Sequence, residues 1–302
     1  FPEGAGSFWS WREEMYRLVE TLDRAGVFEL SLAAFREMRR AGITAVGEFH
    51  YLHHDDAEAA GGEGDFAFDR VVLHAAAAAG IRVALLSAYY QTGGPGRPLD
   101  PAQRRFRTVS PAVYWRQLDA LAAEIAAGPH APLQSLGAVV HSLRAAPPET
   151  AREIRREAAR RELPIHLHVE EQRREIEEIE AAHGRRPMAI LLDDLEPSEA
   201  LTAVHCTHTT PAHLEAFTAA GARVCVCPLT EANLGDGLPE LLRAAGEVAP
   251  EAALFDALEP LLEADLDGVV VATPNALHAP QSLALLEAGL PLFVQKPLGL
   301  DR

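Results

Sequence analysis

The sequence predicts an α/β fold, in which an incomplete TIM-like (β/α)8 barrel is followed by a separate βαβ segment. Three observations support this prediction. Helical patterns alternate with short β-rich runs, which is typical of parallel strands joined by crossover helices. Polar, titratable residues gather where successive predicted strands end, as they do at the catalytic end of such barrels. Composition changes near Gly237, where a stretch rich in Ala, Glu and Leu begins.

The alternation is marked by the pair Ala-Gly, which recurs where a predicted helix stops. Glycine just past a helix end accepts the left-handed conformation that terminates the helix. The pairs end at Gly42, Gly80, Gly221 and Gly289, and a β-rich run follows each one. The predicted strands are 43–50, 81–89, 136–141, 163–169, 201–205, 222–227, 268–272 and 290–294. The predicted helices of the barrel are 31–40, 66–79, 112–127, 150–161, 170–183 and 211–220.

The number of strands sets the domain organisation. Six strands are predicted between Ile43 and Cys227, whereas a closed barrel needs eight. The last two predicted strands flank one helix and form a βαβ unit of a different style. We therefore predict a truncated barrel over residues 1–240 and a second segment over residues 241–302, with the boundary between Gly237 and Glu251.

The composition excludes some classes of partner. A formal charge of −17 argues against nucleic acid and against an anionic membrane surface. The three cysteines, Cys206, Cys225 and Cys227, suit a buried strand and loop better than a disulfide framework. We predict a reducing, cytoplasmic compartment, and the sequence shows neither a signal peptide nor a long apolar run. Because the first residue is Phe1, we expect the sequence to begin inside a longer reading frame or after processing.

The run LPIHLHVEEQ, residues 163–172, carries the first candidate site. His168 ends a predicted strand, and Glu171 lies three residues further on. A histidine there can hold a metal, and a carboxylate in the next loop can move a proton to or from water on that metal. The alternative is a buried barrel histidine beside a helix-capping glutamate. His205, at the end of the next strand, favours a metal hydrolase, whereas we interpret His208 as a loop residue.

Arginines near the strand ends are candidates for binding a carboxylate. His141 and Arg144 follow another predicted strand, and the planar fork of arginine suits a carboxylate. A surface ion pair is the alternative for Arg144, and Arg12 taken alone is more often structural. Asn233 and Asp236 could simply cap a turn.

A second group of histidines follows the first predicted strand. His50, His53, His54 and Asp55 could form a metal site. Crowded loop histidines are usually solvated, however, and we interpret His53 and His54 as exposed.

Several of these motifs occur together in one family. They are FWSWREEMY (8–16), GEFHY (47–51), HSLR (141–144), HLHVEEQ (166–172) and TEANLGDG (230–237). On these motifs and their order, residues 1–237 resemble the formimidoylglutamate deiminase family of the amidohydrolase superfamily. The resemblance implies zinc-dependent hydrolysis of N-formimidoyl-L-glutamate to N-formyl-L-glutamate and ammonia, in histidine degradation.

The resemblance also implies roles for individual residues. His168 matches a zinc ligand, Glu171 the proton-shuttling acid/base, and His205 the histidine that orients the zinc-bound hydroxide. The matching substrate-binding positions, with the arginines facing the substrate carboxylates, are Arg12, Tyr51, His141 and Arg144.

Two departures from the family bear on the metal. The family's first strand carries a His-x-His zinc pair, which would precede Phe1, and its last strand carries a Ser-Asp pair, which does not follow Gly237 here. The barrel would therefore correspond to about strands 2–7 of the family fold. With the other ligands missing, we expect weak zinc binding, impaired activity and two exposed sheet edges.

The C-terminal stretch resembles another family. ATPNALHAP (272–280) followed by QKPL (295–298) resembles the second half of the dinucleotide-binding domain of the Gfo/Idh/MocA oxidoreductases, so a partial Rossmann-like unit is expected. The resemblance implies that a nicotinamide cofactor would be lined by Thr273, Pro274, Asn275 and Lys296. The sequence has no G-x-G-x-x-G motif, so the pyrophosphate cradle is missing and we do not expect NAD(P) to bind.

The resulting hypothesis is a chimeric chain with an amidohydrolase part that acts on a small molecule. A homodimer is left open. The alternatives are a nicotinamide-dependent oxidoreductase fragment and a catalytically dead α/β protein.

Overall fold

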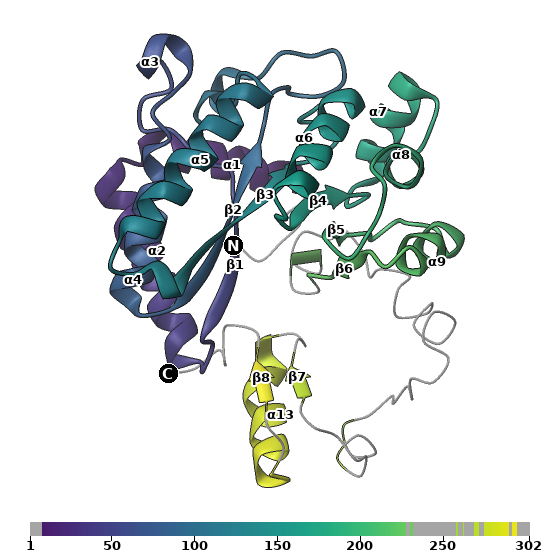
Figure 1. Cartoon of the computed structure of the whole chain (residues 1–302). Helices are drawn as coiled ribbons and strands as arrows, with labels where there is room; N and C mark the ends of the chain where they lie inside the picture. The colour runs from purple at the N-terminus through teal and green to yellow at the C-terminus, as the bar shows by residue number, and fades with distance from the viewer. Residues whose placement is uncertain are drawn as a thin grey trace.

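The computed structural model describes residues 8–227, 230–231, 258, 262, 269–271, 275–289 and 292–294 (Figure 1). The described helices are α1 (Phe8–Thr21), α2 (Arg24–Arg40), α3 (Ala59–Gly62), α4 (Ala67–Ala79), α5 (Pro111–Ala127), α6 (Pro148–Arg160), α7 (Arg173–His183), α8 (Pro187–Asp194), α9 (Pro211–Ala219) and α13 (Asn275–Glu287), with two 3-10 helices, η1 (Pro101–Phe106) and η2 (Ala131–Leu133). The described strands are β1 (Ala45–His50), β2 (Arg82–Tyr89), β3 (Gln134–Val140), β4 (Ile165–Val169), β5 (Leu201–His205), β6 (Arg223–Cys225), β7 (Val269–Val271) and β8 (Leu292–Val294).

The first six strands form one parallel sheet in the order β1-β2-β3-β4-β5-β6. Figure 1 shows this sheet curling like part of a barrel wall, with helices along its outer side. The register brings the carboxyl ends of neighbouring strands level, as where Val169 lies opposite His205. The prediction of an incomplete barrel with six parallel strands is confirmed. Strands β7 and β8, which precede and follow α13 in the sequence, pair with each other in a second parallel sheet. This is the predicted βαβ unit.

The side-chain pattern of β4 explains how the sheet separates its two faces. Ile165, Leu167 and Val169 are at most 1% exposed and belong to the main apolar core. His166 and His168 alternate with them and are therefore on the opposite, concave face, where both line a cavity. Alternation along one short strand thus buries an aliphatic face against the helices and turns two imidazoles inward.

The outer helices pack onto the sheet through apolar stripes. Phe35 of α2 and Val72 of α4 pack with Val83 and Leu85 of β2 in a second core cluster. On the concave face a smaller cluster joins neighbouring strands, and its buried members are Leu86, Ala88 and Val139.

The glycines predicted to end helices have the expected conformation. Gly42, Gly80, Gly221 and Gly289 have φ angles of 83°, 70°, 84° and 75°. These values lie in the left-handed region that a residue with a Cβ disfavours. The prediction that these four glycines end helices is therefore confirmed.

Some elements differ from the prediction. Helices α1 and α8 were not predicted, and α7 begins at Arg173 rather than at residue 170. The later start has a local cause, because Glu170 has a left-handed φ of 51° and cannot continue a helix. Its carboxylate instead accepts the backbone N–H of Met188 at 3.2 Å and pairs with Arg186 at 3.3 Å. The predicted boundary between Gly237 and Glu251 lies outside the described residues. In the described part of the chain, no helix is long and apolar enough to cross a membrane.

Candidate active site

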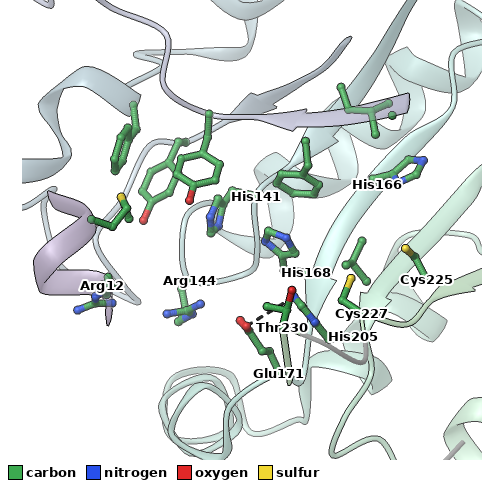
Figure 2. A pocket seen from close by; sticks show the side chains of 18 of the residues that line it. Arg12, His141, Arg144, His166, His168, Glu171, His205, Cys225, Cys227 and Thr230 are labelled. Atoms are coloured by element: carbon green, nitrogen blue, oxygen red, sulfur yellow. Dashed lines mark ion pairs between the residues drawn. The ribbon is translucent and has the colours of Figure 1, made fainter. Parts of the chain in front are cut away.

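A cavity of about 490 Å³ lies on the concave face of the sheet, near the carboxyl ends of the strands. Figure 2 shows side chains from different strands and loops turned toward this space. The lining includes all seven residues that the first resemblance assigned to the site, namely Arg12, Tyr51, His141, Arg144, His168, Glu171 and His205. The fold therefore brings together residues that are far apart in the sequence.

Three imidazoles form the floor of the cavity. His141 follows β3, His168 belongs to β4, and His205 ends β5, so adjacent strands supply them in order. The ring centroids lie 4.9 Å apart between His141 and His168, and 5.2 Å apart between His168 and His205. Phe49 of β1 stacks on His168 at 3.9 Å and fixes the plane of its ring. Because the strands are parallel and in register, their ends place these rings side by side.

The protonation of these imidazoles differs. Burial lowers the pKa of His168 well below its ordinary value, and the neighbouring His141 and His205 lower it further. The pKa of His141 is also well below the ordinary value, through burial and the charge of Arg144. At neutral pH both rings are therefore neutral, and a neutral imidazole has a lone pair with which to bind a metal or accept a proton.

His205 lies between two carboxylates. Its Nδ1 is 3.1 Å from Oε1 of Glu231, and its Nε2 is 3.5 Å from Oε1 of Glu171. Burial lowers the pKa of His205, but the hydrogen bond with Glu231 and the charge of Glu171 outweigh burial and raise it. The backbone is left-handed at His205 and at Cys206, with φ angles of 74° and 54°. Consecutive left-handed residues that are not glycine store strain, which is common where a strand end presents a functional side chain.

Basic and phenolic groups also line the cavity. Arg12 comes from α1, and Arg144 from the loop after β3. Burial lowers the pKa of Arg144, but the charge of Glu175 and other neighbours outweighs burial and raises it, so the guanidinium stays charged. The ring of Tyr51 lies 5.0 Å from that of His141 in an edge-to-face contact. Arg12 and Arg144 are suited to binding an anion, while Glu171 and His205 are suited to proton transfer.

The donor set for a metal is only partly present. His168 fits as a ligand, because its ring is half-buried, neutral and turned into the cavity. Among the described residues, no group of three close donors contains His168. One such group comprises His205, Cys227 and Glu231, and another comprises His50, His53 and Asp69. A catalytic zinc site uses three protein ligands, so His168 alone would hold zinc weakly.

Sequence reasoning missed several residues of the site. Glu231 lies within a motif that was recognised, yet it received no role, and its bond to His205 depends on a contact across 26 positions. Phe49 and Tyr90 also line the cavity; Phe49 lies inside the GEFHY motif but received no role, and no motif contains Tyr90.

The prediction that His53 and His54 are exposed is wrong, because both are 0% exposed. Nδ1 of His53 lies 2.9 Å from the carboxylate of Asp69, and Nε2 of His54 lies 2.7 Å from the carbonyl oxygen of Arg107. Hydrogen bonds to partners far away in the sequence offset the free-energy cost of burying an imidazole. His208 lies in a turn after β5, as expected.

The predicted cofactor residues lie largely beyond the described part of the chain. Thr273, Pro274 and Lys296 are outside the described residues, as are Asn233 and Asp236. The first residue of α13 is Asn275, whose side chain is not among those described.

Comparison with known families supports both resemblances. Residues 2–247 match the amidohydrolase family. Residues 239–301 match an oxidoreductase family with an NAD-binding Rossmann fold. Each resemblance drawn from the motifs is thereby confirmed.

Individual relatives are similar over part of their length. A formimidoylglutamate deiminase of Pseudomonas aeruginosa is 39% identical over 234 residues, which cover 77% of this chain and 50% of that protein. An amidohydrolase from Brucella melitensis has a TM-score of 0.69 and 29% identity, and the match covers 98% of this chain and 57% of that one. An adenosine deaminase from Xanthomonas campestris, solved with bound zinc, shares the fold with a TM-score of 0.63 and 21% identity, over 81% of this chain and 49% of that one. The chain spans about half the length of the curated deiminase it matches.

Proposed function

Because the chain belongs to the amidohydrolase family, we propose that it descends from, and retains the core site of, an enzyme that hydrolyses N-formimidoyl-L-glutamate to N-formyl-L-glutamate and ammonia. The 39% identity to a formimidoylglutamate deiminase supports this choice of substrate. The observation that carries the proposal is the order of charged groups along the cavity. Figure 2 shows Arg12 on the side away from His205 and Arg144 between Arg12 and Glu171, and Glu171 lies 3.5 Å from His205.

This order matches the two ends of the substrate. The glutamate moiety carries two carboxylates, and a planar guanidinium can bind a carboxylate through two parallel hydrogen bonds. We assign these contacts to Arg12 and Arg144, and we assign contacts with the rest of the chain of the substrate to Tyr51 and His141. Binding of the glutamate moiety would leave the formimidoyl carbon near Glu171 and His205.

The chemistry is an addition followed by an elimination. Water adds to the amidine carbon, and the carbon–nitrogen bond to the terminal nitrogen breaks, so that ammonia leaves and a formyl group remains. Glu171 takes a proton from the attacking water and delivers a proton to the departing nitrogen. His205, held by Glu231 through Nδ1 at 3.1 Å, orients the water.

We propose that zinc is the metal and that His168 is its ligand from this chain. A bound zinc ion lowers the pKa of water and so provides a nucleophile near neutral pH. Metal analysis of purified protein should give well under one zinc per chain, since the described residues provide too few donors around His168. Tightly held zinc at one equivalent per chain would contradict this expectation.

Substitution of Glu171 tests the proposed function. Glu171→Gln keeps the size of the side chain but removes the base, so ammonia release should fall at least about 100-fold. The control is Glu157→Gln, because Glu157 pairs with Arg160 and Arg161 on the outer surface of α6. Equal rates in both variants and the unmodified protein would refute the role of Glu171, and no ammonia from the unmodified protein with added zinc would refute the proposed function.

Substitution of Arg144 tests the substrate class. Arg144→Lys keeps the charge but removes the planar fork, so KM should rise by about 10- to 100-fold with a smaller change in kcat. Steady-state measurement of ammonia release separates the two constants. A change confined to kcat would show that Arg144 does not bind the carboxylates.

The C-terminal segment has a separate expectation. We propose that it forms its own unit after a boundary between Gly237 and Glu251, and that it does not bind NAD(P). Limited proteolysis should cut first between those two residues, and NADH fluorescence should stay unchanged on addition of the protein. Saturable NADH binding would support the oxidoreductase alternative.

A further inference from the structure

A second cluster of buried polar side chains lies behind β1 and β2, on the face away from the cavity. The carboxylate of Asp69, in the first turn of α4, is at its centre. Nδ1 of His53 lies 2.9 Å from Oδ2, and Oγ of Ser87 donates to Oδ1 at 2.9 Å. Nε2 of His50 lies 3.7 Å from Oδ2. All four residues are at most 6% exposed, and the proposed reaction uses none of them.

The hydrogen bonds of His53 engage both of its ring nitrogens. Its Nε2 lies 2.7 Å from the carbonyl oxygen of Ala88, which can only accept, so Nε2 carries a proton. Burial raises the pKa of Asp69, but the charges of His53 and His50 outweigh burial and bring that pKa well below its ordinary value. Asp69 is therefore a carboxylate that can only accept, and Nδ1 of His53 must donate to it.

Two histidines near Asp69, His50 and His53, lie on either side of Tyr51 in the sequence. His50 ends β1 and faces Asp69, and the next residue, Tyr51, lines the cavity. Two residues after Tyr51, His53 binds the same carboxylate. Asp69 therefore holds the chain two residues after Tyr51 through His53 and faces His50 one residue before it, and the ring of Tyr51 lies 5.1 Å from that of Phe106.

Asp69 and His53 also form hydrogen bonds with the neighbouring strand, β2. Ser87 of β2 donates to Asp69, and the carbonyl of Ala88 accepts from His53. Two residues beyond Ala88, Tyr90 lines the cavity, with its ring 4.6 Å from that of His141. Asp69 and His53 thus tie together the two segments that supply the tyrosines of the cavity wall.

We propose that Asp69 and His53 form a buried ion pair that positions Tyr51, and through β2 also Tyr90, against the substrate. They are positioning residues rather than catalytic residues, because neither lines the cavity. The choice of substrate rests on the proposed function, whereas the ion pair does not.

A double-mutant cycle tests whether Asp69 acts through Tyr51. Asp69→Asn should raise KM about tenfold while kcat changes less than about threefold, and its effect on KM should be clearly smaller in a Tyr51→Ala background, where only the contribution through Tyr90 is left. The control is Asp119→Asn, because Asp119 is an exposed residue of α5 that pairs with Arg161, far from the loop that carries Tyr51. Additive effects of the two substitutions would overturn the positioning role.

The cycle is repeated with calorimetric binding of L-glutamate, which carries both carboxylates but does not react. A non-additive cycle for L-glutamate without ammonia release would reject the proposed function and support the positioning role. Unchanged glutamate binding in a folded Asp69→Asn variant, or an unmodified chain that binds neither compound, would overturn the positioning role. If circular dichroism shows that Asp69→Asn does not fold, Ser87→Ala takes its place, because it removes one hydrogen bond from the same carboxylate.

The charge state is tested directly on the full chain. Nitrogen-15 NMR of labelled histidines at about neutral pH should show both ring nitrogens of His53 protonated. A neutral ring would overturn the ion pair. So would a bound metal that Asp69→Asn loses and Glu171→Gln retains, because His50, His53 and Asp69 would then form a metal site.

Discussion

Two buried tyrosines behind the site allow the contribution of hydrogen bonds to the free energy of unfolding to be measured at neighbouring positions. Tyr114 of α5 and Tyr89 of β2 are both 0% exposed, and their rings meet edge to face at 5.7 Å. The hydroxyl of Tyr114 donates to the carbonyl of Ser87 at 2.8 Å and accepts the N–H of Val139 at 3.0 Å. In the described part of the chain, the hydroxyl of Tyr89 has no hydrogen-bond partner. The two side chains therefore differ mainly in their hydrogen bonds.

The expected magnitudes follow from these contacts. Tyr114→Phe leaves a buried carbonyl and a buried N–H without the bridging hydroxyl, and each unsatisfied group costs about 1–3 kcal/mol. Partial closure of β2 onto β3 would recover some of this cost, so the free energy of unfolding should fall by about 2–4 kcal/mol. Tyr89→Phe removes a polar group that was already buried without a partner. Its free energy of unfolding should therefore stay unchanged or rise by up to about 1 kcal/mol.

Urea unfolding followed by circular dichroism measures both variants. The dependence on urea should be the same in both, because neither substitution changes the surface exposed on unfolding. Equal losses in the two variants, or a larger loss in Tyr89→Phe, would refute the reasoning. The result bears on the site, since β2 and β3 lead into Tyr90 and His141.

Other predictions concern thiol reactivity and backbone conformation. The hydrogen bond with Cys227 lowers the pKa of the exposed Cys225 to about 7, whereas burial raises that of Cys206. Iodoacetamide at about pH 7.5 should therefore alkylate Cys225 well before Cys206 in the native protein, and peptide mass mapping checks this order; equal rates would contradict it. Gly64→Ala should lower the free energy of unfolding by more than about 2 kcal/mol, because φ is 88° and the new Cβ would overlap the buried ring of His54. Gly42→Ala, with a φ of 83° but open space around it, should cost only about 1 kcal/mol in urea unfolding, and equal losses would show that the overlap is unimportant.

The elements that could be predicted are those set by local patterns. The Ala-Gly pairs marked helix ends correctly, because the left-handed φ of a glycine such as Gly80 is a property of one residue. The run 163–169 was recognised as a strand, and β4 spans Ile165–Val169. Helix α7 was predicted to start too early, since the left-handed turn at Glu170 depends on Met188 and Arg186 of a later segment. No pattern within residues 170–183 contains that information.

By itself, the sequence determined the order of the strands, most of the helices between them, and the strand ends that carry His141, His168 and His205. It did so because hydrophobic periodicity and motif residues are local properties of the sequence, which can be recognised before the fold is known. Only the tertiary structure decided which charges meet. The partnership of Glu231 with His205, and the burial of His53 against Asp69, depend on how the curled sheet brings distant segments within hydrogen-bond distance. A partner's position in space is set by packing of the whole sheet and its helices, so residue spacing alone left His53 as a solvated loop residue.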